Sequence, residues 1–336
     1  MSWRILFMGT PDFAATVLKS IASFGFNIIC AVSQPDKPQG RHHRMTPTPV
    51  RLAAEALGLP VWQPSSLKTP ESWEYLQQLA PDLIVTAAYG RILPPAWLEL
   101  PRFGAVNVHA SLLPRYRGAA PVQWSLINAD QETGISFMQM DRVMDHGPVL
   151  SQHHLLIEPE DTAERLMKRL AELAAATLPT DLQLFFAGRL RPLPQDEQQA
   201  SYVHLLKRED GLIDWHKTAG AIDCLVRGTN PWPGAYTVLN HKNLKIFQTA
   251  VVSKAEQAAY QALDQADQAC PGTVVRADRQ GLWVSCGQGT LLSLQELQLE
   301  GRRRLPAAEV AHNLKTGLCF NGQQPANRAQ GTGASE

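Results

Sequence analysis

The sequence predicts an α/β protein: a Rossmann-like N-terminal domain with a mostly parallel sheet, followed by a small C-terminal β-barrel domain of the OB-like type. Three observations lead to this prediction. Short apolar runs alternate with helical patterns in the first half of the chain, which is typical of a parallel sheet covered by helices. Short β-rich runs with frequent turn residues follow in the second half. The 336 residues, 44% of them hydrophobic, suffice for a large core and a smaller one.

The N-terminal domain begins with a strand, a turn and a helix. Residues 5–9 are an apolar run, Thr10 and Asp12 offer helix caps, and residues 13–24 have helical periodicity. Further apolar runs predict strands of the same sheet at 27–33, 60–63, 82–88, 104–109 and 134–140. The turn after the first strand lacks the three-glycine spacing of a dinucleotide site, which gives a nicotinamide-dependent enzyme little support.

A long helix closes the first domain. Apolar residues recur at helical spacing over residues 161–188, and Asp161 or Thr162 can start the helix. Pro179 lies inside this pattern, so we expect a break or kink there.

Domain limits follow from composition. Residues 189–203 are polar and rich in proline, which predicts an exposed linker between a domain at 1–188 and a second domain at 204–320. Residues 321–336 contain almost nothing apolar, so we expect a disordered tail.

The second domain combines one helix with many short strands. Helical periodicity predicts a helix at 218–227. Short β-rich runs predict strands at 236–239, 244–249, 272–276, 281–286 and 289–297. This pattern favours a small barrel.

Charge and cysteine content narrow the class of protein. The 31 basic and 31 acidic side chains balance, so a polyanion has to be bound by local groups and not by the overall field. The five cysteines are scattered without paired spacing, which is typical of a reducing cytoplasm. The apolar run at the N-terminus is too short for a signal peptide, and no stretch reaches the ~20 apolar residues that span a bilayer. We expect a cytoplasmic protein with no membrane association, and a monomer.

Two polar side chains share one face of the strand predicted at 104–109. Residues two apart on a strand point the same way, so Asn107 and His109 lie together while Val106 and Val108 face the other side. The strand runs into a loop rich in glycine and proline, at the sheet edge where open α/β sheets bind ligands. The asparagine amide and a protonated imidazole can both donate hydrogen bonds to a polarised carbonyl oxygen.

A carboxylate near this pair completes a candidate active site. Asp141 and Asp145 lie in a turn between apolar segments, and either can keep the imidazole charged. Taken singly, each of these polar residues is more often structural, so the joint pattern carries the hypothesis. No metal is expected, because the adjacent pairs His42–His43 and His153–His154 point to opposite faces of a strand and lack a third ligand.

Several motifs resemble those of one enzyme family. Residues 107–114 (NVHASLLP), 116–121 (YRGAAP) and 144–148 (MDHGP) are similar to the signature of the formyltransferases that use 10-formyltetrahydrofolate. Further similarity lies at 9–13, 34–38 and 88–94, in the family's order. The resemblance implies that Asn107, His109 and Asp145 are the catalytic residues, and that 10-formyltetrahydrofolate donates the formyl group. It also implies a folate pocket bordered by Arg91, Ile92, Leu93, Ser111, Leu112, Leu113 and Pro114.

The acceptor has to be inferred outside the catalytic residues. The basic segment 39–51 resembles the loop by which tRNA-formylating members of the family approach the acceptor stem, with Arg41 at the position of the key arginine and Arg44 beside it. The C-terminal domain resembles their tRNA-binding barrel, where Lys207 and Arg208 are candidate contacts. The resemblance therefore implies that the acceptor is the α-amino group of methionyl initiator tRNA. A sugar-nucleotide amine, or a non-catalytic RNA- or folate-binding protein, are the alternatives.

Overall fold

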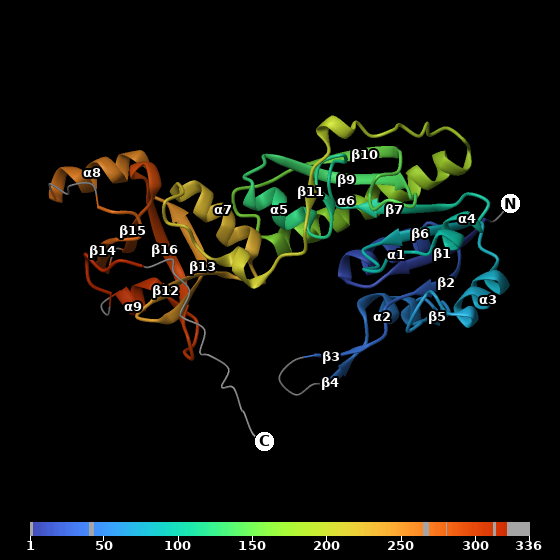
Figure 1. The fold of residues 1–336 in the computed structure, drawn as a ribbon, viewed down its shortest axis with the longest axis horizontal. Helices are drawn as coiled ribbons and strands as arrows, with labels where there is room; N and C mark the ends of the chain where they lie inside the picture. Colours follow the sequence, from blue (N-terminus) through green and yellow to red (C-terminus); the bar gives the residue numbers. More distant parts are fainter. Residues whose placement is uncertain (1–2, 40–43, 265–268, 280, 312–313, 321–336) are drawn as a thin grey trace, which may run out of the picture. The chain divides into compact units, whose positions relative to one another are not determined.

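The computed structural model describes residues 3–39, 44–264, 269–279, 281–311 and 314–320 (Figure 1). The chain forms two compact units. The first comprises Met1–Trp124, Gln131–Pro159 and Arg165–Leu205, and the second Ser125–Asp130, Glu160–Glu164 and Leu206–Glu336. Residues 189–203 thus pack with the first unit. The predicted tail at 321–336 lies outside the described residues.

A seven-stranded sheet forms the centre of the first unit, in the order β10-β9-β7-β6-β1-β2-β5. Its strands are β1 Arg4–Gly9, β2 Asn27–Val32, β5 Val61–Trp62, β6 Leu83–Ala87, β7 Ala105–His109, β9 Glu132–Gln139 and β10 Val149–Leu156. The pairs from β5 to β7 are parallel, β9 is antiparallel to β7, and β10 is antiparallel to β9. The prediction of a mostly parallel sheet is confirmed.

Helices connect and cover these strands: α1 Asp12–Ser23, α2 Pro49–Ala56, α3 Pro70–Leu79, α4 Pro95–Glu99, α5 Pro121–Ile127 and α6 Ala163–Phe186. Helices α2 and α3 begin with a proline after a threonine cap, and the hydroxyls of Thr48 and Thr69 accept the amide hydrogens of Arg51 and Ser72. The predicted caps of α1 are wrong. Its N-cap is Pro11, which has no side-chain cap, and the Thr10 hydroxyl donates to the Tyr89 carbonyl and accepts from the Gln34 amide.

Side chains alternate between the two faces of the sheet, and one face supports a continuous cluster. Leu6, Ile84 and Ala105 contribute to it from the strands, and Leu76 of α3 and Trp97 of α4 cover them. Apolar helix residues meet alternate strand residues, so burial fixes the strand register.

Gly9 at the end of β1 permits the close approach of α1. A Cβ there would lie 2.5 Å from Ala14 Cβ and 2.8 Å from the Ala87 carbonyl oxygen. The turn from β1 into α1 therefore requires glycine.

Helix α6 runs through Pro179 without ending, so of the break or kink predicted there, the break is wrong. Proline has no amide hydrogen and leaves the carbonyl four residues earlier without its helical donor. That carbonyl belongs to Ala175, and the hydroxyl of Ser20 in α1 donates to it. A side chain of a neighbouring helix thus replaces the missing bond.

The second unit contains an antiparallel sheet with the order β12-β13-β16-β15-β14 and β17 beside β16. Its strands are β12 Ala235–Leu239, β13 Lys242–Val251, β14 Val274–Asp278, β15 Gly281–Ser285, β16 Leu291–Leu299 and β17 Leu305–Pro306. Helices α7 Ala219–Thr229 and α9 Ala307–Val310 bury apolar residues against one core, among them Ile222 and Val310. This unit is consistent with the small barrel that the sequence predicts.

Three smaller features complete the fold. Strands β3 Lys37–Gln39 and β4 Arg44–Thr46 form a hairpin. Strands β8 Arg117–Gly118 and β11 Tyr202–Val203 pair in parallel. Helix α8 Lys254–Asp264 was not predicted, and its Tyr260 packs against Trp283 in a separate small cluster. Among the described helices, none combines the length and apolar character needed to cross a membrane.

Candidate functional site

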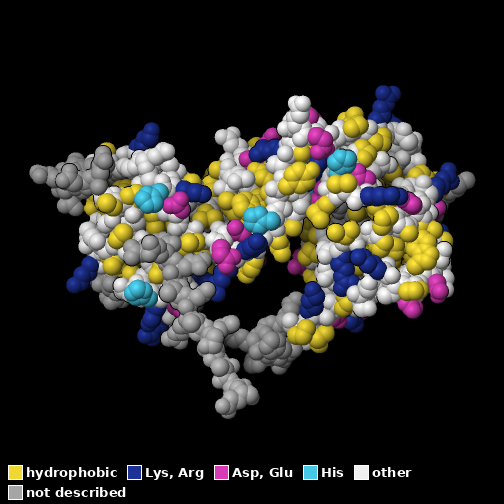
Figure 2. Space-filling model, viewed as in Figure 1, with side chains coloured by type: hydrophobic (Ala, Val, Ile, Leu, Met, Phe, Trp, Pro, Cys, Tyr) yellow, Lys and Arg dark blue, Asp and Glu magenta, His cyan; other side chains and the backbone are white. Residues whose placement is uncertain are grey.

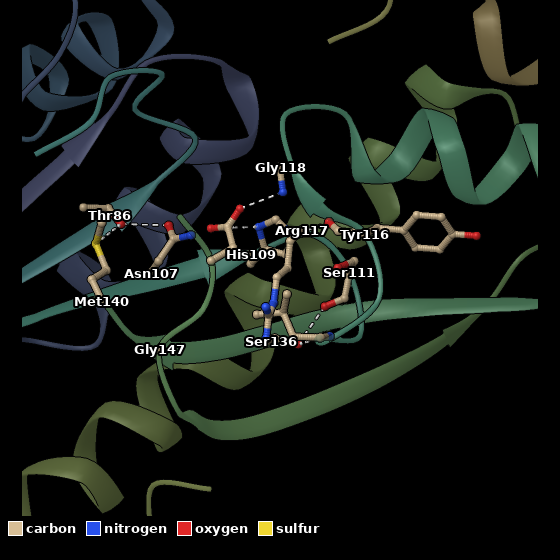
Figure 3. Close-up of polar contacts among 12 residues, drawn as sticks. Thr86, Asn107, His109, Ser111, Tyr116, Arg117, Gly118, Ser136, Met140 and Gly147 are labelled. Atoms are coloured by element: carbon tan, nitrogen blue, oxygen red, sulfur yellow. Dashed lines mark hydrogen bonds and ion pairs between the residues drawn. The ribbon is translucent and has the colours of Figure 1, made fainter. Parts of the chain in front are cut away.

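Asn107 and His109 lie at the carboxyl end of β7, between β6 and β9. They share one face of the strand, and both neighbours, Val106 and Val108, are buried on the other. The sequence-predicted juxtaposition of these two side chains is therefore present in the structure (Figure 3).

The Asn107 amide is oriented by the neighbouring strand. The Thr86 hydroxyl of β6 donates to Asn107 Oδ1 at 2.7 Å, and it also lies 3.1 Å from the Val106 carbonyl oxygen. With its oxygen bound there, the amide turns its nitrogen toward the side of His109 (Figure 3). The NH₂ group is thus placed as a donor at the strand end.

The His109 ring is buried and has a different acceptor at each nitrogen. Nε2 lies 3.0 Å from the carbonyl oxygen of Tyr116, which can only accept, so Nε2 carries a hydrogen. Nδ1 lies 3.7 Å from Asp145 Oδ1. This distance is too long for a hydrogen bond, and the two groups form an ion pair only when the ring is charged.

Asp145 comes from the segment between β9 and β10. Its backbone has a left-handed φ of 52°, which is uncommon for a residue with a side chain. Its Oδ2 accepts the amide hydrogen of Gly118 at 2.9 Å. Two residues on, a Cβ at Gly147 would lie 2.0 Å from the Gln139 carbonyl oxygen, so the tight path of this segment requires glycine.

The structure distinguishes the two carboxylates that the sequence left open. Asp141 accepts from the Val143 amide and lies 2.6 Å from His146 Nδ1, both within its own turn. Asp145, and not Asp141, faces His109.

Together these groups suit reactions at a carbonyl carbon. An amide NH₂ and a ring N–H are donors for an oxygen that gains negative charge, and a nearby carboxylate can stabilise the cationic ring. Fixed donors of this kind stabilise the transition state more than the planar ground state.

The residues predicted to border a folate pocket lie on the loops after β6 and β7: Arg91, Ile92, Leu93, Ser111, Leu112, Leu113 and Pro114. Ile92 is 75% exposed, so its side chain is available to a ligand. Leu93 and Leu113 are buried, and the Ser111 hydroxyl donates to the Arg115 carbonyl. Arg91 donates to the carbonyls of residues 64 and 65.

The predicted tRNA contacts are only partly described. Lys207 and Arg208 are exposed at the start of a short 3-10 helix, Arg208–Gly211. Arg41 lies outside the described residues, and Arg44 begins β4 with a side chain that is likewise outside them.

The adjacent histidines of β10 have separate partners. His153 Nε2 lies 2.7 Å from Asp181 Oδ2, and His154 Nδ1 lies 3.3 Å from Glu132 Oε2. Within the described part of the chain, no three His, Cys, Asp or Glu side chains form a group that could hold a metal ion.

Sequence reasoning missed four side chains around the site. Thr86 orients Asn107, and Arg117, Gln195 and Glu197 form a network behind Asp145. Thr86 could have been found as the polar residue of an otherwise apolar strand adjacent to Asn107. Gln195 and Glu197 lie in the aperiodic segment 189–203, which gives no pattern to read.

Comparison with known proteins identifies the class. The formyl transferase family profile matches residues 3–182, and the profile of the formyl transferase C-terminal domain matches residues 205–315. The chain belongs to the formyl transferase family. The prediction of a formyltransferase enzyme is confirmed.

Curated relatives narrow the comparison. The chain is 45% identical over 306 residues to the methionyl-tRNA formyltransferase of Geobacter sulfurreducens, covering 91% of this chain and 92% of the relative. It is 44% identical to the methionyl-tRNA formyltransferase of Pelotomaculum thermopropionicum, covering 91% and 94%.

Solved structures of other formyltransferases share the fold at low sequence identity. The sugar 3N-formyl transferase WlaRD has a TM-score of 0.63 at 15% identity, over 90% of this chain and all of that one. The N-formyltransferase of Helicobacter canadensis has a TM-score of 0.63 at 16% identity, over 88% and 99%. At this identity, the likeness concerns the fold alone.

Proposed function

We propose that the protein transfers the formyl group of 10-formyltetrahydrofolate to the α-amino group of methionyl initiator tRNA, giving N-formylmethionyl-tRNA for translation initiation. One observation carries the choice of acceptor: relatives named methionyl-tRNA formyltransferase are 41–45% identical over 91–94% of this chain. The similarity spans both matched regions, 3–182 and 205–315. The sugar formyltransferases resemble the chain only in fold.

The proposed reaction begins when the methionine amine attacks the formyl carbon on folate N10. The carbonyl oxygen becomes an oxyanion, and the Asn107 NH₂ group and a hydrogen on His109 Nδ1 donate to it. Nδ1 can serve because the 3.7 Å to Asp145 leaves it without a hydrogen bond to that carboxylate. Each well-placed donor contributes roughly 3 kcal/mol to the barrier reduction.

Proton transfer completes the reaction. The attacking nitrogen loses a proton, the bond between the formyl carbon and N10 breaks, and N10 gains a proton. Asp145 assists this movement directly or through a water, while its charge stabilises the protonated His109. The Gly118 amide donates to Asp145 Oδ2 at 2.9 Å, and this bond fixes the Asp145 carboxylate beside the His109 ring.

The substrate contacts form a second part of the proposal. The loops after β6 and β7 border the folate. The candidate contacts with the tRNA are Arg41 and Arg44 of the basic segment 39–51 in the first unit and, separately, Lys207 and Arg208 in the second. Basic side chains are scattered over the face drawn in Figure 2, and the formal net charge is zero, so RNA binding depends on such local groups. We place the monomeric protein in the cytoplasm, where its acceptor is made.

An acceptor screen with a labelled formyl donor tests this function. Wild-type protein is incubated with 10-formyltetrahydrofolate and, in separate reactions, with methionyl initiator tRNA, methionyl elongator tRNA, uncharged tRNA and a 4-amino-sugar nucleotide. We expect label on methionyl initiator tRNA far in excess of every other acceptor. Label on the sugar nucleotide without label on charged tRNA overturns the acceptor. No label on any acceptor, with donor binding intact, supports the non-catalytic alternative.

A further inference from the structure

We infer that Gln195, in the segment that follows α6, is a positioning residue for Asp145. The inference rests on the proposed function, because it assigns Gln195 to the same reaction. According to this inference, the segment 189–203 contributes a residue to the site, although most of its side chains are exposed.

Gln195 holds the backbone on both sides of the segment that carries Asp145. Its Nε2 donates to the Asp145 carbonyl oxygen at 2.8 Å and to the Gly147 carbonyl oxygen at 2.8 Å. Asp145 has the left-handed φ of 52°, a conformation that needs support from its surroundings. Two hydrogen bonds from one amide supply that support at the residue whose carboxylate faces His109.

Arg117, the first residue of β8, holds the Gln195 side chain in place. The Arg117 side chain is only 1% exposed, and its Nε donates to Gln195 Oε1 at 3.0 Å. Its two terminal nitrogens donate to the Glu197 carboxylate at 2.7 and 3.0 Å, and one also donates to the Tyr202 hydroxyl at 2.8 Å. This paired hydrogen bonding lowers the pKa of Glu197, which keeps the carboxylate charged.

Glu197 adds a second link to the Asp145 segment. Its Oε1 lies 3.4 Å from Nε2 of His146, the residue after Asp145. The strand β8 that contains Arg117 also provides the Gly118 amide that binds Asp145 Oδ2. The Asp145 carboxylate is thus bound by β8, and its backbone is bound by Gln195. These two partners are themselves connected, because β8 pairs with β11, which lies in the same segment 189–203 as Gln195.

This arrangement ties the distance between His109 and Asp145 to Gln195. A side chain that released the Asp145 backbone would let the carboxylate leave its place between the Gly118 amide and His109 Nδ1. Displacement of a reacting group by about 1 Å lowers a catalytic rate by about 10²-fold. We expect substrate binding to change little, because the residues proposed to border the folate lie on the loops after β6 and β7.

The decisive variant is Gln195→Glu. Its carboxylate retains an oxygen for Arg117 Nε, so the anchor persists, but it has no hydrogen to donate to the two carbonyls. Gln195→Met, with a side chain of similar volume, removes the bond from Arg117 as well as the bonds to the two carbonyls. The matched control is Gln198→Glu, which makes the same chemical change at an exposed position of the same segment.

Each variant is measured in three ways: steady-state kinetics, which give kcat and KM for both substrates; the thermal midpoint; and the hydrogen exchange of the Gly118 amide resolved to single residues. For Gln195→Glu we expect kcat to fall by about 10²-fold, with KM within about twofold. The midpoint falls by only a few degrees, because two hydrogen bonds are lost, and the Gly118 amide exchanges faster because its acceptor moves. Gln198→Glu retains wild-type values.

Two results would overturn the inference. The first is a Gln195→Glu enzyme with wild-type kcat, where only Gln195→Met loses activity in step with its thermal midpoint, since that is the behaviour of a purely structural side chain. The second is unchanged Gly118 exchange in Gln195→Glu. This second measurement needs no acceptor, so it decides the inference even if the wild-type protein fails to formylate methionyl-tRNA and the proposed function is lost.

Discussion

At the scale of single residues, the two ring nitrogens of His109 have different neighbours. The Tyr116 carbonyl oxygen, 3.0 Å from Nε2, fixes the ring and its hydrogen. Nδ1 faces Asp145 at 3.7 Å, and in the proposed reaction it is the nitrogen that donates to the substrate oxygen. The ring is buried, and its orientation is therefore set before any substrate binds.

The cysteines provide a residue-scale prediction about reactivity and pH. Burial raises the pKa of the Cys30 thiol to about 11 and that of Cys286 to about 12, because it disfavours the charged thiolate. Cys270 and Cys319 are exposed. At about pH 8.5, which is close to the normal pKa of a thiol, we expect iodoacetamide to label the two exposed cysteines of the folded protein and to leave Cys30 and Cys286 unlabelled. Peptide mass spectrometry measures the labelling of each cysteine.

The same shifts set the direction of a stability change. A thiol with a raised pKa in the folded state contributes stability below its unfolded value of about 8.5, and that contribution is lost as pH rises toward 11–12. Unfolding in urea followed by labelling should expose both buried thiols. Rapid labelling of Cys30 or Cys286 in the folded protein at pH 8.5 would contradict their burial.

The sequence could predict the pair at the strand end but not the carboxylate that joins it. Alternation along β7 is a local property, and it places Asn107 and His109 on one face. Asp141 and Asp145 are four residues apart in a segment without periodicity. Which of them faces His109 depends on a left-handed backbone at Asp145 and on an amide from β8, far away in the sequence.

At the scale of elements, α6 shows how a helix tolerates an internal proline. Pro179 leaves the Ala175 carbonyl without its helical donor, and the Ser20 hydroxyl of α1 supplies one. The expected break or kink followed from the missing amide hydrogen of proline alone. A partner on another helix is a tertiary contact, which local pattern does not reveal.

This replacement predicts a coupling between Ser20 and Pro179. Ser20→Ala should lower the free energy of unfolding by about 1–2 kcal/mol, since it leaves the Ala175 carbonyl without a donor. In a Pro179→Ala background, the restored amide hydrogen can bond that carbonyl, so Ser20→Ala should cost clearly less. Urea unfolding of the four proteins measures the difference. Ser23→Ala, at an exposed serine of the same helix that bonds the Ser20 carbonyl, is the control. An equal cost of Ser20→Ala in both backgrounds would refute the account.

The other elements differ in how clearly the local sequence pattern predicts them. The apolar runs of β1, β2, β6 and β7 are visible because most residues on both faces of these strands are buried. Strand β10 lies at the sheet edge with alternating exposure and two histidines, so its signal is weak. Residues 189–203 are largely exposed, and nothing in their composition indicates that Gln195 binds the Asp145 segment.

At the scale of the whole molecule, the two units require different kinds of argument. The first unit contains the candidate site, which can be built from named distances within that unit. The second has an antiparallel sheet and an apolar core. Its proposed part in tRNA binding rests on relatives that match over more than nine-tenths of the chain. With a balanced formal charge, discrimination between acceptors must come from local contacts and not from long-range attraction.

The central claim is that the buried imidazole of His109 stabilises the transition state of formyl transfer to methionyl-tRNA. The most direct measurement compares single-turnover formylation by wild-type protein and His109→Ala at saturating donor and acceptor, alongside the Kd for the formyl donor. His154→Ala, at an exposed histidine of β10, is the control. The account predicts a transfer rate lower by about 10²–10³-fold in His109→Ala, a donor Kd within about twofold of wild type, and a normal rate in His154→Ala. Formylation by His109→Ala at the wild-type rate would contradict it.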